Sequence, residues 1–163
     1  MSVTIRKMTE DEYEYFYRWS VEHQAADLSE ELQIPQEEAL RETINEISEM
    51  LPDGPNTAHN HLMSILEPDS GETAGFIWTM HEETAGRKQS FLCDFAIWES
   101  KRRKGYAAEA LLLAEQAAAA AGCAESVLFA ADRNIAAKAL YQKCGYQVLR
   151  RKDYGCYMFK QLI

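Results

Sequence analysis

The chain has 163 residues, of which 47% are hydrophobic and 26% are charged, so we expect a single globular domain over residues 1–163. Its net charge of −9 and its pI of about 5.0 argue against a general nucleic-acid-binding protein, which needs a positive surface. The apolar runs are far shorter than a membrane span, and the N-terminal residues are charged from Arg6 onward, so neither a membrane segment nor a secretory signal is expected.

The first half of the chain predicts a strand, two helices and then strands. Residues 3–5 indicate a short strand, and residues 9–28 have helical spacing that begins with a capping-box pattern of Thr9 and Glu12. A second helix is predicted from Pro35, a favourable first-turn residue, to Met50. Residues 61–68 and 74–81 predict two strands of a hairpin, and residues 90–98 predict a nearly continuous apolar strand.

The second half alternates helices and strands. Helices are predicted over residues 105–121 and 134–144, with strands over residues 126–131, 146–151 and 154–163. The order β-α-α-β-β-β-α-β-α-β-β predicts an α/β fold with one mixed sheet and helices on both faces. The crossover between residues 91 and 131 requires a parallel pair, whereas the hairpins require antiparallel pairs.

The third predicted helix begins in an unusual way. The residues before it are Lys101, Arg102, Arg103, Lys104 and Gly105, and none of their side chains can accept a hydrogen bond from the first helical amides. Unpaired amides at the positive end of a helix dipole bind phosphate groups, and a glycine lets such a group approach the backbone. A solvated basic turn explains this stretch equally well when it is taken alone, and the known P-loop and dinucleotide-binding patterns are absent.

Two motifs together point to one family. Arg102-x-x-Gly105-x-Ala107 after an apolar strand resembles the acetyl-CoA signature (R/Q)-x-x-G-x-(G/A) of the GNAT superfamily of N-acetyltransferases. Downstream, "NIAAKALYQKCGYQV" resembles the pattern N-x-x-A-x-x-L-Y-x-K-x-G-(F/Y) of the same superfamily. The predicted element order also resembles that of the superfamily over essentially the whole chain, least so in the first fifty residues. One departure is Glu99, where the superfamily often has a proline.

The resemblance implies that acetyl-CoA is the co-substrate and that the backbone amides of residues 102–107 hold its pyrophosphate. The strand residues 95–97 would pair with its pantetheine arm as an added strand does, and Asn134 would bond to the pantetheine or to neighbouring backbone. The implied cofactor-binding residues are Phe95, Ala96, Ile97, Arg102, Arg103, Lys104, Gly105, Tyr106, Ala107, Asn134 and Ala137.

The resemblance also implies that Tyr141 is the general acid for the departing thiolate. By helical spacing, Tyr141 shares a face with Asn134 and Ala137, whereas Ala136, Leu140 and Cys144 form an apolar face that we expect to enter the core. A tyrosine that only packs against the sheet is the structural alternative.

Asp94 is the leading candidate for the general base, because a carboxylate within an apolar strand has a raised pKa. A structural, paired carboxylate is equally compatible with its position. His23, His61 and Glu22 are weaker candidates. His59 and His61 lack an apparent third ligand, and Cys93, Cys123, Cys144 and Cys156 show no metal or redox spacing, so no metal site and a reduced, cytoplasmic setting are expected.

The sequence therefore predicts an N-acetyltransferase that moves the acetyl group of acetyl-CoA to a primary amine by direct attack in a ternary complex. A small-molecule acceptor is favoured, and the alternatives are a protein N-terminus or lysine as acceptor, or a non-catalytic acyl-CoA-binding domain. Residues 22–49 contain nine acids and one base, Arg41, which form either a solvated face or a surface that attracts a cationic amine. No nucleic-acid or membrane partner is expected, and a homodimer is left open.

Overall fold

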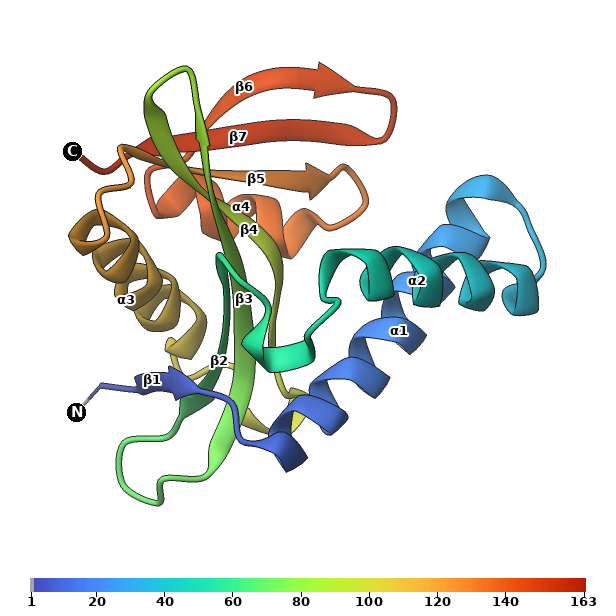
Figure 1. Ribbon diagram of the computed structural model, residues 1–163, viewed down its shortest axis with the longest axis horizontal. Coiled ribbons are helices and arrows are strands. Elements are labelled where there is room, and N and C mark those ends of the chain that lie inside the picture. Colours follow the sequence, from blue (N-terminus) through green and yellow to red (C-terminus); the bar gives the residue numbers. More distant parts are fainter. Residues whose placement is uncertain (1) are drawn as a thin grey trace.

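A seven-stranded mixed sheet organises the protein, with strand order β1-β2-β3-β4-β5-β7-β6. The computed structural model describes residues 2–163, and Figure 1 shows its elements. The strands are β1 (Thr4–Lys7), β2 (Asn60–Leu66), β3 (Thr73–Thr84), β4 (Arg87–Ile97), β5 (Glu125–Ala131), β6 (Gln147–Lys152) and β7 (Gly155–Gln161). The helices are α1 (Glu10–Leu32), α2 (Gln36–Met50), α3 (Tyr106–Ala120) and α4 (Ile135–Lys143), with short 3₁₀ turns η1 (Gly54–Asn56) and η2 (Glu99–Lys101).

The predicted element order and the mixed sheet are confirmed. β4 and β5, which α3 connects, form the parallel pair. The other neighbouring strands pair in antiparallel fashion. A crossover helix places two strands in the same direction, whereas a short turn reverses the chain, so the connections determine the sheet.

Helices cover both faces of the sheet, as the alternating side chains of the strands require. On β3, Ile77 packs with buried residues of α3 and α4. Its neighbours Phe76 and Trp78 point to the other face and pack with Phe16 of α1 and Ile47 of α2. The two cores fix the position of β4, which passes between them.

Two elements are longer than the sequence predicts. The β3–β4 hairpin extends to Thr84 and Arg87, and its exposed, polar tip lacks the apolar alternation by which a strand is recognised. Its turn residues Ala85 and Gly86 have φ angles of 54° and 76°, the conformation that tight hairpins use. Helix α1 continues beyond residue 28 to Leu32 and ends at Gln33, whose φ angle is 55°.

Candidate active site

The centre of the sheet opens where β4 and β5 diverge. The two strands pair only from Gln89↔Glu125 to Leu92↔Leu128, although β4 continues to Ile97 and β5 to Ala131. The pairing of β4 with β3 shifts between Leu92 and Asp94, which makes Cys93 the extra residue of a β-bulge. In Figure 1, β5, β7 and β6 turn away from β2, β3 and β4. Beyond Leu92, β4 therefore pairs on the β3 side but no longer with β5, and an extended ligand could add to the edge that faces the gap.

A groove of about 560 Å³ occupies this opening. It is lined by residues of β4, the start of α3, α4 and α1. Most of the sequence-predicted site residues line it, namely Phe95, Ala96, Ile97, Arg102, Arg103, Gly105, Tyr106, Ala107, Asn134, Ala137 and Tyr141. Lys104 and Asp94 do not belong to the lining. Its size and its mainly apolar walls with a few polar groups are typical of small-molecule sites.

The start of α3 has no side-chain cap. Gly105 is the N-cap residue with a φ angle of 80°, and no side chain bonds to the first amides. Glu109, in the first turn, instead accepts a hydrogen bond from the Val3 N–H at 2.9 Å. A Cβ atom added to Gly105 would contact only Glu109 Oε2, at 3.9 Å, so the surface around this residue is open. The exposed amides, the helix dipole and the groove fit an anionic group such as a pyrophosphate.

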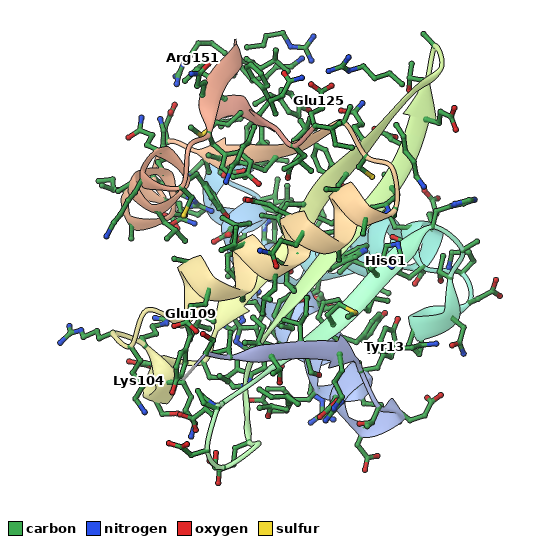
Figure 2. All side chains as sticks on the ribbon, turned by 90° about the vertical axis from the view of Figure 1, so that its left-hand side faces the viewer. Tyr13, His61, Lys104, Glu109, Glu125 and Arg151 are labelled. Atoms are coloured by element: carbon green, nitrogen blue, oxygen red, sulfur yellow. The ribbon has the colours of Figure 1, made fainter. Side chains whose placement is uncertain are left out.

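The four cations before α3 have different partners. Lys101 forms ion pairs with Glu67 and Glu72 of the β2–β3 loop, and Lys104 lies 3.4 Å from Glu67 Oε2. These lysines hold the pKa of Glu67 at about 2, together with the Tyr106 hydroxyl, which donates to Glu67 at 2.9 Å. Figure 2 shows Lys104 and Glu109 near the start of α3. The loop thus neutralises the lysines and leaves the two arginines beside the groove.

Arg102 holds the turn against the sheet. Its Nε donates to the Ile97 carbonyl oxygen at 2.9 Å, which ties the residues before α3 to the last residue of β4. Arg103 is exposed and has a φ angle of 68°. Within residues 2–163, the guanidinium of Arg103 has no ion-pair partner, so it is the more available of the two arginines for an anionic ligand.

Tyr141 is the buried residue of α4, and it lines the groove from the side opposite β4. Its ring lies 5.9 Å from the ring of Tyr146. Burial and, next, the charge of Asp94 raise the pKa of Tyr141 to about 12.

The expectation that Ala136, Leu140 and Cys144 form the core face of α4 is wrong in part. Ala136 is exposed, because the short helix turns Tyr141 rather than Ala136 toward the sheet.

Asp94 lies next to the bulge of β4 and faces α1. Its Oδ2 accepts hydrogen bonds from Ser20 Oγ at 2.9 Å and Gln24 Nε2 at 3.0 Å. Its Oδ1 accepts from the Phe95 N–H at 2.9 Å. Burial raises the pKa of Asp94, as expected from its apolar strand, and these three donors oppose the rise. The carboxylate thus accepts three hydrogen bonds, and its charge contributes to the raised pKa of Tyr141.

Helix α1 supplies a wall of the groove that the sequence did not predict, although His23 was named as a weaker candidate for the base. Trp19 and His23 line the groove, and the rings of these two residues stack with centroids 3.8 Å apart. The signal that could have identified this wall is the spacing of Trp19, Ser20, His23 and Gln24, which places four polar or aromatic side chains on one side of the helix.

His61, another candidate base, lies against His81, and no cluster of three metal-ligating side chains occurs between residues 2 and 163. Over the same range, no helix is long and apolar enough to cross a membrane.

Comparisons with known proteins agree with this geometry. The model of the acetyltransferase (GNAT) family matches residues 9–146. The uncharacterized N-acetyltransferase YycN of Bacillus subtilis (strain 168) is 28% identical over 147 residues, which cover 90% of this chain and 94% of that protein. YdgE, an uncharacterized N-acetyltransferase of the same organism, is 30% identical over 146 residues, or 90% of this chain and 92% of that protein.

Solved structures show the same fold. The crystal structure of YycN superposes with a TM-score of 0.83 at 26% identity, and the match covers 93% of this chain and 98% of that chain. Spermidine N-acetyltransferase from Vibrio cholerae, in complex with CoA and spermine, has a TM-score of 0.71 at 12% identity, with 99% and 96% of the two chains covered.

Proposed function

The chain belongs to the acetyltransferase (GNAT) family, whose enzymes use acetyl-CoA, and from this premise we propose that it transfers the acetyl group to the primary amine of a small molecule. The amine attacks the thioester directly while both substrates are bound. The observation that carries this proposal is the uncapped start of α3, which lines the same groove as the free edge of β4. In an acyl-CoA the pyrophosphate is joined to the pantetheine arm, an extended chain with two amide groups, so these two features match two adjoining and chemically distinct parts of the molecule.

The proposed roles of the groove residues follow from their positions. The amides around Gly105 and the guanidinium of Arg103 hold the pyrophosphate, with Arg102 fixing the turn to β4. Residues 95–97 pair with the pantetheine arm. Asn134 caps α4 by accepting from the Ala137 N–H at 3.4 Å and lines the groove, which supports a role for its amide group in binding the same arm.

Tyr141 is proposed as the acid that protonates the leaving sulfur. Its pKa of about 12 keeps the hydroxyl protonated at neutral pH, which an acid requires. Asp94 is proposed to supply the negative charge that the proton-removing step needs, either as the base itself or as the anion beside the base. Its raised pKa and its proximity to Tyr141 support a place in this step.

A cationic amine is the proposed acceptor. Helices α1 and α2 carry the acids of residues 22–49, and α1 also lines the groove. An acidic surface next to a site raises the local concentration of cations. The spermidine N-acetyltransferase of similar fold binds the polycation spermine, which is consistent with such an acceptor.

The test of the proposed function is turnover by a Tyr141→Phe variant, after a panel of amines, polyamines, amino acids and peptides has been screened by release of the CoA thiol. The substitution keeps the ring and deletes the hydroxyl. We expect kcat to fall by roughly 10²-fold or more, with little change in acetyl-CoA affinity. Tyr157→Phe, on β7 outside the groove, is the matched control and should keep normal turnover.

Two results would contradict this proposal. If no amine of the panel releases CoA with the wild-type protein, the acetyltransferase activity itself is wrong. If Tyr141→Phe turns over at nearly the wild-type rate while chemistry limits the reaction, Tyr141 is only a packing residue. In that case its loss should cost no more than about 1 kcal/mol of stability.

A further inference from the structure

We infer that His23 is the base that removes the proton from the acceptor amine, an inference that rests on the proposed function. His23 lies on α1 and lines the groove that Tyr141 enters from α4. The side chain is exposed, so an acceptor amine can reach it. The two helices thus present an imidazole and a phenol to the same opening between β4 and β5.

The imidazole is held in one orientation and one tautomer. Its Nδ1 lies 2.8 Å from the carbonyl oxygen of Trp19. A carbonyl oxygen only accepts hydrogen bonds, so Nδ1 carries the hydrogen and Nε2 of the neutral ring has the available lone pair. Stacking on Trp19, with an interplanar angle of 16°, fixes the plane of the ring. Among the described residues, Nε2 has no hydrogen-bond partner.

Asp94 is better suited to stabilise this base than to act as the base. Its Oδ2 already accepts from Ser20 and Gln24, and its Oδ1 accepts from the Phe95 N–H. These bonds leave little room for a proton from an amine, and Asp94 does not line the groove. The two donors Ser20 and Gln24 lie on the same helix as His23, so they hold the carboxylate next to the helical turn that carries the imidazole. The charge of His23 is one of the influences that lower the pKa of Asp94, so the two groups lie within electrostatic reach of each other.

The proton balance assigns a separate task to each group. An amine that arrives as an ammonium ion first gives a proton to His23 Nε2. This loss frees the lone pair of the amine nitrogen. The neutral nitrogen then attacks the acetyl carbon, the C–N bond forms, and the C–S bond breaks. The sulfur takes the Tyr141 hydroxyl proton. The nitrogen loses its second proton as the amide forms. Of the two protons that the amine nitrogen has then lost, one restores the Tyr141 hydroxyl and the other goes to solvent.

Chemical rescue is the decisive test. His23→Ala should lower kcat with a cationic acceptor by roughly 10²-fold or more, the usual contribution of a general base. Added imidazole should restore the activity of this variant at least about tenfold, because a small base can occupy the space of the lost ring. Acceptor amines that are largely neutral at the assay pH should lose less activity than strongly basic ones. The acetyl-CoA-induced rise in melting temperature should remain, which shows that the variant is folded and binds the donor.

His61→Ala is the matched control. His61 is also exposed, but it lies on β2, away from the start of α3 (Figure 2), so its loss should leave kcat and the response to imidazole unchanged. The inference is overturned if His23→Ala keeps kcat within about threefold of the wild type. It is also overturned if the loss occurs but imidazole does not restore activity. Because the wild-type protein acetylates the acceptor in each case, both results leave the proposed function intact.

Discussion

Helices α1 and α3 begin in opposite ways. At the start of α1, the Thr9 hydroxyl accepts from the Glu12 N–H at 3.2 Å, and the Glu12 carboxylate accepts from the Thr9 N–H at 2.9 Å. Glu12 also pairs with Arg6 at 2.7 Å, which, with these bonds, lowers the pKa of Glu12 to about 2. At the start of α3, Gly105 has no side chain, and no other side chain bonds to the first amides.

The difference separates a helix start that stabilises the fold from one that is available to a ligand. Absence of a cap is insufficient by itself, because α2 also begins without a side-chain cap at Pro35. Its first turn carries Glu37 and Glu38, which complement the helix dipole, and none of these residues lines the groove. Among the helices within residues 2–163, α3 alone combines a start without a side-chain cap, neighbouring arginines and a groove, and this combination supports the proposal that an anion binds there.

Of the changes that test this comparison of helix starts, the largest expected effect comes from adding one methyl group to the open start of α3. Gly105→Ala should weaken acetyl-CoA binding at least about tenfold, because a Cβ would stand where the phosphate approaches the backbone, and tenfold corresponds to ~1.4 kcal/mol. Isothermal titration measures the affinity directly. The variant also forces a non-glycine residue into a φ angle of 80°, which costs roughly 1–2 kcal/mol of stability.

Gly122→Ala separates this strain from the effect on the ligand. Gly122 follows the other end of the same helix with a φ angle of 94°, and a Cβ there would meet nothing within 4 Å. The variant should lose a similar amount of stability and bind acetyl-CoA normally. An equal loss of affinity in both variants would show that backbone strain, and not the phosphate, explains the result.

A smaller effect is expected at the closed helix start. Thr9→Ala removes the hydroxyl of the capping box and should lower the free energy of unfolding by about 1 kcal/mol, as the loss of an N-cap usually does. Urea unfolding measures this change. Acetyl-CoA affinity should not change, because Thr9 lies outside the groove. A clear fall in acetyl-CoA affinity would contradict the view that the start of α1 stabilises the fold without a part in ligand binding.

The uncapped start of α3 was predictable from the sequence because every feature of it is local. A cationic run, a glycine and an apolar helix lie within a few residues of one another, and the backbone around Gly105 follows from them. The contacts of the turn were not predictable, since Glu67 lies 34 positions before Lys101 and nothing in the β2–β3 loop marks it as a partner. The burial of Asp94 was predictable from its apolar strand, whereas its donors Ser20 and Gln24 come from a helix 70 or more positions away.

The groove wall on α1 was missed for a different reason. Helix α1 is covered by the sheet on one side and by α2 on another, so its polar and apolar residues do not form a simple two-sided pattern. Buried Phe16 and Val21 indicate the core side, but Trp19 and His23 lie between the core and solvent. Whether such residues line a groove depends on how far β4 and β5 diverge, which no sequence pattern near α1 describes.

The smallest expected effect tests the opposite charges around the groove. The start of α3 is positive, whereas α1 and α2 carry the acids of residues 22–49, three of which, Asp27, Glu30 and Glu31, pair with Arg133. If this surface attracts the acceptor, raising the salt concentration from roughly 0.05 to 0.5 M should increase the KM of a cationic amine a few-fold and leave that of a neutral amine unchanged, because exposed charges are screened. Glu30→Gln should raise the KM of the cationic amine at low salt, since it leaves Arg133 less neutralised. Glu83→Gln, at the exposed tip of the β3–β4 hairpin, should not. A polyanion as the best acceptor of the panel would mean that these acids only keep the surface solvated.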